Sequence, residues 1–505
     1  MKSVAEGEYK VRSGRARLRI HGDLLAPIRS SVINCGPLRP WVSVFVHGAA
    51  WATYGDVGKR AAATLVYPSL GPLPPLTLRR IIRDNHFRIR EAATCSETVP
   101  PSWPQWAAAL SHSYEKECGM IPTTELAFSI EEYKSRVART RQAMRKEGLQ
   151  LLLIHTPENI FYLTGYQTPG YYTYQCFVLP LEGEEVMLTR RLEVTNVHAR
   201  SWIDKTVTWM DTEDPIGTTV RMIHGLGAAR HRIGVEMASW FLTVAHFEKL
   251  KAQLPDASLL DASRIVDRLR LVKSPAEIAY IRKAATMATR SLRAGLKALP
   301  SCRTDLDLAV VINDALVASG SEYSGLPPFV ATGPTSSITH ATWSNRRLKR
   351  GDCIFLEIPG CFHRYHAAYM RTAVIGKPPE KWERAARVVR EGLEAAMQSI
   401  RPGATSGEVD HACRSVIAAA GLAENHRHRV GYSIGIAFPP DWGEGHIMSI
   451  KPNDPTLLEA GMTFHLVPTV FFDGEAQIGL SETVLVTDSG CEQLTRGVRR
   501  ELIAV

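Results

Sequence analysis

The 505-residue sequence lacks several patterns that would each indicate a class of protein. Its nine cysteines contain no Cys-x-x-Cys pair, so neither a zinc knuckle nor a disulfide framework is indicated. No apolar run reaches the length of a membrane span, and the opening segment MKSVAEGEYKVRSGR lacks the apolar core of a secretory signal. We therefore expect a cytoplasmic protein with free thiols and no membrane partner.

Excess charge of one sign is also missing from most of the chain. The net charge is +9, but residues 1–119 hold 16 Lys or Arg against 9 Asp or Glu, and residues 120–505 hold 44 against 42. The main body is therefore nearly neutral, and we expect no nucleic-acid partner. What is present is a hydrophobic content of 45%, enough for a sizeable core spread over two or three domains.

One stretch of the sequence, residues 351–372, has the pattern of a β-hairpin. Residues 353–358 are apolar and β-prone, and the run is short, so they predict a buried strand. The dipeptide Pro359-Gly360 predicts a turn, and residues 365–370 predict the returning strand.

The predicted hairpin places an acid and an imidazole on its inner face. Because side chains alternate along a strand, Glu357 shares a face with Phe355, and His366 shares one with Ala368 and Met370. A carboxylate in an apolar strand needs a partner or a task. We expect the His366 imidazole to approach Glu357 across the hairpin.

This hairpin resembles that of the pita-bread enzymes, which include methionine aminopeptidase, prolidase, creatinase and ectoine hydrolase. Gly351, Asp352, Arg371 and Thr372 keep the frame of the family motifs G-D-x-x-x-x-D and S-D-x-T-R-T. The resemblance implies an α/β (α+β) protein, in which a creatinase-type α/β domain precedes a curved, mostly antiparallel sheet backed by helices.

The metal ligands of the metal-dependent members are mostly replaced. The resemblance puts Glu357, Ala368, Tyr432 and Val467 at four of the five ligand positions and keeps the fifth acid as Glu482. A two-metal site bridged by carboxylates cannot be built from two glutamates alone. The pattern therefore points to the metal-free branch of creatinase and ectoine hydrolase, with no metal and no other cofactor.

The resemblance also divides the chain. Residues 159–165 resemble the N-x-x-Y-L-T-G of creatinase-type N-terminal domains, which places such a domain at 120–271. Residues 273–278 match the K-S-P-x-E-I that opens the catalytic domain, which then covers 272–505.

Residues 1–119 carry no such resemblance. They are rich in Arg, Pro and Trp, and Pro74-Pro75 and Pro100-Pro101 interrupt any long element. Two interpretations are open: a small accessory domain, or upstream sequence translated from a start codon placed too early. We favour the second, because the residues after Met120 look like the opening of a chain of this family.

Three residues are the expected catalytic set. Glu357 either attacks the substrate or activates water, a choice that the sequence leaves open. His340 occupies the position of the creatinase histidine that shuttles a proton, and His366 is the second candidate donor. The alternative is structural: a carboxylate satisfied by backbone donors, and histidines without a task.

The expected substrate contacts come from the neighbours of the replaced ligands. The candidate binding residues are Tyr432, His465, Glu482, Asp441, Trp442, Met370 and Tyr171. Asp441 and Trp442 lie in a segment that matches the Y-P-P-D-W-G-E of ectoine hydrolases and suit an amidinium group, and Glu482 would pair with a cation. Tyr171 either packs in the core or serves the subunit boundary of a homodimer.

The pocket composition favours a small cyclic amidine as the substrate. Met370 and Val467 stand where creatinase has the two glutamates that hold a guanidinium, so creatine would be left unpaired. The resemblance implies hydrolytic opening of the ectoine ring to N-acetyl-diaminobutyrate. The alternatives are another amidine or guanidine, a Xaa-Pro dipeptide, or a non-enzymatic binding member of the fold.

Overall fold

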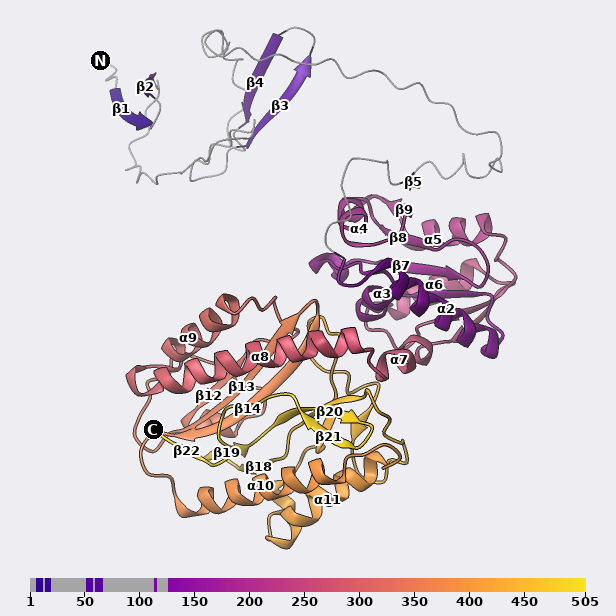
Figure 1. The fold of residues 1–505 in the computed structure, drawn as a ribbon. Helices are drawn as coiled ribbons and strands as arrows, with labels where there is room; N and C mark the ends of the chain where they lie inside the picture. The colour runs from indigo at the N-terminus through magenta and orange to yellow at the C-terminus, as the bar shows by residue number, and fades with distance from the viewer. Residues whose placement is uncertain (1–5, 12–13, 20–50, 58–59, 67–112, 116–125) are drawn as a thin grey trace. The chain divides into compact units, whose positions relative to one another are not determined.

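The computed structural model describes residues 6–11, 14–19, 51–57, 60–66, 113–115 and 126–505 (Figure 1). It divides the chain into two compact units, residues 1–100 and residues 101–505. In the first unit, two antiparallel pairs form, β1 (Glu6–Val11) with β2 (Gly14–Arg19) and β3 (Trp51–Val57) with β4 (Arg60–Val66). Whether residues 1–119 are an accessory domain or upstream sequence is a question that lies largely outside the described residues.

An α/β domain opens the second unit. Its seven-stranded sheet has the order β11-β10-β6-β7-β8-β9-β5. The strands are β5 (Ser113–Glu115), β6 (Leu151–Ile154), β7 (Cys176–Pro180), β8 (Val186–Arg190), β9 (Lys205–Trp209), β10 (Arg232–Val235) and β11 (Ser258–Asp261). Because β5 pairs with β9, the sheet takes in three residues upstream of the predicted boundary at 119.

Helices pack around this sheet, and capping residues in the sequence mark where α2 begins and ends. They are α2 (Ile130–Glu147), α3 (Pro157–Thr164), α4 (Val194–Arg200), α5 (Pro215–Gly225), α6 (Val244–Gln253) and α7 (Arg264–Leu271), with the short turns η1 (Pro169–Tyr172) and η2 (Arg191–Glu193). Ser129 caps α2 by accepting a hydrogen bond from the Glu132 amide, and Gly148 ends it with a φ of 67°.

The second part of this unit, residues 275–505, holds two mostly antiparallel sheets. Their strand orders are β12-β13-β14-β22 and β16-β15-β17-β20-β21, beside a separate β18-β19 pair. The strands are β12 (Phe329–Thr332), β13 (Cys353–Phe362), β14 (Tyr365–Val374), β15 (Gly431–Ser433), β16 (Ser449–Ile450), β17 (Thr463–Leu466), β18 (Thr469–Phe472), β19 (Ala476–Gly479), β20 (Glu482–Thr487), β21 (Gly490–Gln493) and β22 (Ile503–Ala504).

Four long helices cover these sheets from outside. They are α8 (Pro275–Ala298), α9 (Asp305–Ala318), α10 (Glu380–Ser399) and α11 (Ser406–Ala419), with the short turns η3 (Leu299–Ser301), η4 (Gly333–Ser337) and η5 (Ala423–Asn425). Figure 1 shows α8 lying across β13 and β14, and α10 and α11 on the side of the later strands. The predicted fold class, an α/β domain followed by sheets backed by helices, is confirmed.

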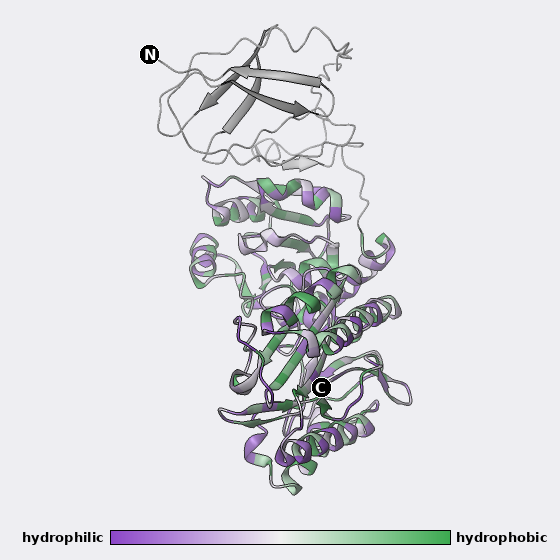
Figure 2. Ribbon diagram, turned by 90° about the vertical axis from the view of Figure 1, so that its left-hand side faces the viewer, coloured by the Kyte–Doolittle hydropathy of each residue, from purple (hydrophilic) through white to green (hydrophobic). Residues whose placement is uncertain are grey.

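The helix faces are set by apolar periodicity. Along α10, Trp382, Ala385, Val389, Leu393 and Ala396 are buried at spacings of three and four residues, so they form one stripe against the sheet. Figure 2 shows the same periodicity, since hydrophilic and hydrophobic residues alternate along the helices, whereas the strands are mostly hydrophobic. Within the part of the chain that the structure describes, no helix has both the length and the apolar character needed to cross a membrane.

The central hairpin forms, but its predicted turn is wrong. Strand β13 continues through Pro359 and Gly360, and the chain reverses at His363 and Arg364, whose φ angles are 47° and 63°. Gly360 is required for a different reason, because a Cβ at this position would lie 2.0 Å from the Ala284 carbonyl oxygen of α8. The glycine permits close packing of helix on strand.

Candidate active site

Apolar side chains from both sheets gather around Glu357, and this cluster is the candidate pocket. The residues that pack together around it are Phe329, Ala331, Phe355, Ala368, Met370, Tyr432, Ile434, Trp442 and Val467. The Glu357 side chain is 12% exposed, so most of it is shielded from solvent. The predicted inward direction of Glu357, Phe355 and Met370 agrees with this arrangement.

The carboxyl group of Glu357 has an unusual environment. Among the described residues it has no hydrogen-bond partner, and His465 Nδ1 lies 4.0 Å from Oε1. Burial, together with the nearby negative charge of Asp441, raises the pKa of Glu357 to about 8. The group is therefore mostly protonated at neutral pH, and a cationic ligand beside it would favour its ionised form.

A chain of hydrogen bonds forms the polar wall of the pocket. Trp442 Nε1 donates to the Tyr432 hydroxyl at 2.8 Å, and this hydroxyl lies 3.0 Å from His465 Nδ1. His465 Nε2 lies 2.7 Å from the Ser481 hydroxyl, which accepts from the Met370 amide at 2.8 Å. Burial lowers the pKa of His465 to about 3, so the ring is neutral. Ser481 was not anticipated from the sequence.

His340 lies at the solvent side of the pocket. Its side chain is exposed, its φ is 61°, and its ring centroid is 5.4 Å from that of Phe329. Phe329 is the residue of β12 that pairs directly with Glu357 of β13. Phe329 therefore links the His340 ring to the position of Glu357.

The predicted approach of His366 to Glu357 is wrong. Glu357 pairs with Met370, and His366 lies four residues further along β14, about 13 Å at 3.3 Å per residue. Its ring is occupied by the backbone, because Nε2 accepts from the Gly325 amide at 3.0 Å and Nδ1 lies 2.9 Å from the Arg364 carbonyl oxygen. His366 therefore positions loops and has no contact with Glu357.

The expected contact between Glu482 and a cationic substrate group is also wrong. Glu482 is fully buried, and its Oε1 accepts from Arg371 at 2.8 Å and from Arg500 at 3.3 Å. Its Oε2 accepts from the Thr495 hydroxyl at 2.5 Å. The preceding residue, Ser481, is the one that reaches the pocket, because neighbouring side chains point to opposite sides of an extended chain.

Asp441 and Trp442 lie on a loop, residues 438–444, that extends to the pocket. Contacts from the α/β domain hold the first residues of this loop. Glu158 Oε1 accepts from the Phe438 amide at 3.0 Å, and the Tyr171 hydroxyl donates to the Pro439 carbonyl oxygen at 3.1 Å. The Tyr171 ring also packs edge-on against Phe438, at 5.4 Å between centroids. Of the two predicted roles for Tyr171, the structure therefore shows packing within its own chain.

The loop is held at its end by a buried ion cluster. Glu444 accepts from Arg270 Nη2 and from Lys273 Nζ, each at 2.7 Å, and from the Ser433 hydroxyl at 3.0 Å. Burial alone would disfavour the charge of Glu444, but Lys273 and Arg270 outweigh it and lower its pKa to about 2. Arg270 belongs to α7, so both ends of the loop depend on the α/β domain.

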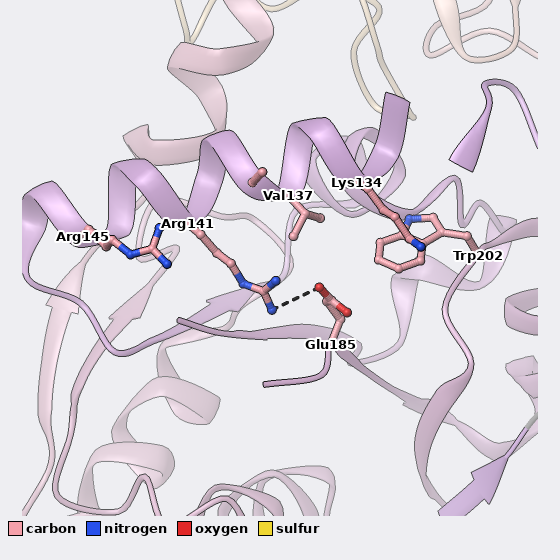
Figure 3. Close-up of a pocket in the computed structure, with 7 residues that line it drawn as sticks. Lys134, Val137, Arg141, Arg145, Glu185 and Trp202 are labelled. Atoms are coloured by element: carbon pink, nitrogen blue, oxygen red, sulfur yellow. Dashed lines mark ion pairs between the residues drawn. The ribbon is translucent and has the colours of Figure 1, made fainter. Parts of the chain in front are cut away.

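A separate hollow lies on the α/β domain beside α2 (Figure 3). Its volume is about 380 Å³, and Lys134, Arg141 and Arg145 line it together with Trp202. Arg141 pairs with Glu185 at 3.1 Å, as the dashed line marks, and Arg145 pairs with Glu182 at 2.8 Å. Its arginines are already neutralised, so this hollow is a weak candidate for a site.

The side chains near Glu357 do not fit a pair of metal ions. Ala368 and Val467 offer no donor atom, the Tyr432 hydroxyl is engaged with Trp442 and His465, and Glu482 is bound by arginines. Nowhere in the described ranges do three or more His, Cys, Asp or Glu side chains gather as a ligand set. We therefore derive no chemical step through a metal.

Two family models match the chain in tandem. Residues 136–272 match the creatinase/prolidase N-terminal domain, and residues 279–488 match metallopeptidase family M24. These limits follow the two parts of the second unit, with α7 at the end of the first part and α8 at the start of the second.

Curated relatives cover the same region. The chain is 32% identical to the ectoine hydrolase of Halomonas elongata over 389 residues, which are 73% of this chain and 96% of that protein. It is 31% identical to the uncharacterized hydrolase/peptidase y4tM of Sinorhizobium fredii, over 75% of this chain and 98% of that one.

Solved structures with this fold include dipeptidases and prolidases. Dipeptidase PepE from Mycobacterium ulcerans is 27% identical with a TM-score of 0.66, over 75% of this chain and 99% of that chain. The prolidase from Thermococcus sibiricus is 25% identical with a TM-score of 0.68, over 75% and 100%. The chain therefore belongs to the hydrolases of metallopeptidase family M24 that carry a creatinase/prolidase N-terminal domain.

Proposed function

We propose that the chain hydrolyses a small cyclic amidine without a metal, and that ectoine is its substrate. The observation that carries this proposal is the carboxyl group of Glu357, which is buried among apolar side chains and has no hydrogen-bond partner in the part of the chain that the structure describes. A cationic amidine ring would supply the missing partner and favour the carboxylate. The likeness to the ectoine hydrolase of Halomonas elongata supports the same choice.

The walls of the pocket support ectoine over creatine. Met370 and Val467 are almost fully buried and offer only apolar surface. The guanidinium of creatine presents donors on every side, and against these walls several would lose their hydrogen bonds. The ring of ectoine is more apolar, so Glu357 and Asp441 suffice for its charged edge.

The proposed reaction adds water across the amidine. With the cationic ring bound, ionised Glu357 attacks the amidine carbon or takes a proton from the water that attacks it. A ring carbon–nitrogen bond then breaks, and His340 delivers a proton to the departing nitrogen. If Glu357 has attacked the carbon, water then displaces it and the bond from Glu357 to carbon breaks, which restores the carboxylate. The oxygen of water becomes the amide oxygen of N-acetyl-diaminobutyrate, and its two protons end on nitrogen or in solvent.

A Xaa-Pro dipeptidase is the second candidate, because the solved structures with this fold include prolidases. Metal-dependent peptide hydrolysis would need metal ligands at the positions of Ala368 and Val467, whose side chains have no donor atom.

The proposal also includes a cytoplasmic location and a homodimer. Tyr172, exposed to 76% at the surface of η1, is a residue on which a second copy could dock.

The test is a parallel incubation of purified protein with ectoine, creatine and a Xaa-Pro dipeptide, with metal analysis of the same sample. We expect ring opening of ectoine alone, at a rate that a chelator leaves unchanged. Cleavage of the dipeptide, or activity that a chelator abolishes and manganese restores, would overturn the proposal.

A further inference from the structure

A cavity of about 390 Å³ lies next to the Glu357 pocket. The loop residues Asp441 and Gly443 line it, and Arg429 lines it as well. Gly443 packs against the Tyr432 ring, where a Cβ would come within 2.6 Å, and the charge of Asp441 acts on Glu357. The volume suits a small ligand. The cavity is linked to the residues around Glu357 through Gly443, which lines it and contacts Tyr432.

Arg429 is a cation without an acid. No carboxylate of the described residues lies within 4.0 Å of its guanidinium, whereas the buried Arg270 and Arg371 each contact one. Its Nη1 donates to the Ser449 hydroxyl at 3.0 Å, and its Cζ lies 4.6 Å from the centre of the Tyr432 ring. Its Nε is buried, and no hydrogen-bond partner for it lies within the described ranges. A guanidinium with a donor to spare is suited to bind a carboxylate.

Asp441 is the matching acid, and no cation neutralises it. Its Oδ1 accepts from the Gly443 amide at 3.0 Å, within its own loop, and no Lys or Arg of the described residues lies within 4.0 Å of its carboxylate. Asp441 and Arg429 line one cavity but do not pair with each other. A ligand with charges of both signs would satisfy both side chains at once.

The other charged side chains of the cavity are already occupied. Glu158 accepts from Phe438, Glu236 accepts from the amides of residues 155 and 156 and from Asn159, Asp267 accepts from Asn159, and Arg264 donates to the carbonyl oxygens of residues 446 and 447. Asp441 and Arg429 therefore remain the pair that is open to a ligand.

We propose that Arg429 binds the carboxylate of a zwitterionic substrate, while Asp441 holds the cationic ring beside Glu357. The inference rests on the proposed function and deepens it, because it assigns the carboxylate of ectoine to one residue. It also defines the substrate class as small molecules that combine an amidinium with a carboxylate. Amidines without the carboxylate should bind weakly.

The experiment compares Arg429→Gln with Arg427→Gln, a control two residues away whose guanidinium pairs with the exposed Asp473 at 2.8 Å. KM and kcat are measured with ectoine, and Ki with the same ring lacking its carboxylate, as a competitive inhibitor. Loss of a charge-assisted pair should raise KM about a hundredfold in Arg429→Gln, with kcat and Ki nearly unchanged. Arg429→Lys should recover part of the loss, and the control should match wild type.

Two results would overturn the assignment while leaving the proposed function intact. One is an unchanged KM for ectoine in Arg429→Gln. The other is a parallel rise of KM and Ki, which would mean that Arg429 only supports the Tyr432 wall. Absence of ectoine turnover by wild type is a different result, since it overturns the proposed function and the assignment with it.

Discussion

Two buried glutamates, 87 residues apart in the sequence, have opposite surroundings. Glu444 lies between Arg270 and Lys273 and accepts a further hydrogen bond from Ser433. Glu357 lies in an apolar pocket where no hydrogen bond to its carboxyl group forms among the described residues. The pKa of the first is lowered to about 2 and that of the second is raised to about 8.

The difference suits the two glutamates to different roles, one structural and one chemical. A fully paired carboxylate such as Glu444 holds its charge at every ordinary pH and fixes the loop on which Asp441 and Trp442 lie. An unpaired one such as Glu357 is poised to change its charge near neutral pH, which is what a base or a nucleophile needs. Each prediction below tests whether the two glutamates differ in this way.

The largest expected effect is on activity in Glu357→Gln. The amide keeps the size of the side chain but can neither attack carbon nor take a proton from water, so ectoine turnover should fall by roughly a thousandfold or more. Steady-state kinetics with purified enzyme measure this. Turnover close to that of wild type would remove Glu357 from the mechanism.

The same variant should remain folded. Because the pKa of Glu357 is raised in the folded protein, that protein holds its proton more tightly than the unfolded chain, and stability is lost as the pH rises through about 8. The glutamine has no proton to lose. Thermal melting at pH 9 should therefore show a higher Tm for Glu357→Gln than for wild type.

Glu444→Gln should act on stability first. The change leaves Lys273 buried without its acid and leaves Arg270 with only the more distant Asp267, and loss of such a partner costs about 3 kcal/mol. Chemical denaturation measures the loss in free energy of unfolding. Asp473→Asn, which breaks an exposed pair with Arg427, is the control and should change little. A small effect in Glu444→Gln would mean that the cluster does not hold the loop.

His340→Ala tests whether the neighbours of Glu357 share in the chemistry. Its loss should lower kcat for ectoine about a hundredfold, as loss of a general acid does, without changing Tm, because the side chain is exposed. His411, an exposed histidine on α11, offers a control in His411→Ala. Equal activities of the two variants would assign the proton transfer to another group.

The smallest expected effect is a dependence on pH. If the ionised form of Glu357 is required, kcat/KM should rise about tenfold from pH 7 to pH 9, since its pKa is raised to about 8. Glu444 stays ionised throughout this interval and contributes no change. The profile of kcat/KM against pH is measured with ectoine at constant ionic strength. Because kcat/KM reports the groups of the free enzyme, a kcat/KM that does not change between pH 7 and pH 9 would contradict the assignment.

The sequence was sufficient for the features that depend on local pattern. Alternation along residues 353–358 predicted the inward face of Glu357 and Phe355. The motifs also led to the replaced ligands at Ala368 and Val467. These features need only neighbouring residues and a repeat of two or 3.6.

The register of the hairpin needed tertiary information. A loop over residues 359–364 places His366 opposite Glu357, whereas the true turn at His363 and Arg364 places Met370 there. A shift of four residues keeps the same face but moves the partner along the strand, so the alternation argument could not detect it. Gly360 packs closely against α8 and lies inside strand β13, so it is not part of the turn.

Two further residues show different limits of the sequence. The outward direction of Glu482 follows from alternation with Ser481, so a stricter use of the pattern would have turned it away from the pocket, although not paired it with Arg371. The open guanidinium of Arg429 has no such signal. Its lack of an acid is a property of the folded neighbourhood, and no motif encodes it.

The loop of residues 438–444 has a consequence for how this enzyme can be altered. Glu158, Tyr171 and Arg270 hold the loop from the α/β domain, yet the loop carries Asp441 and Trp442 to the candidate pocket of the second domain. A chimera that joins this catalytic domain to the N-terminal domain of a relative would lose those fastenings and with them the shape of the pocket. Libraries that seek new substrates should therefore vary these three positions together with the pocket itself.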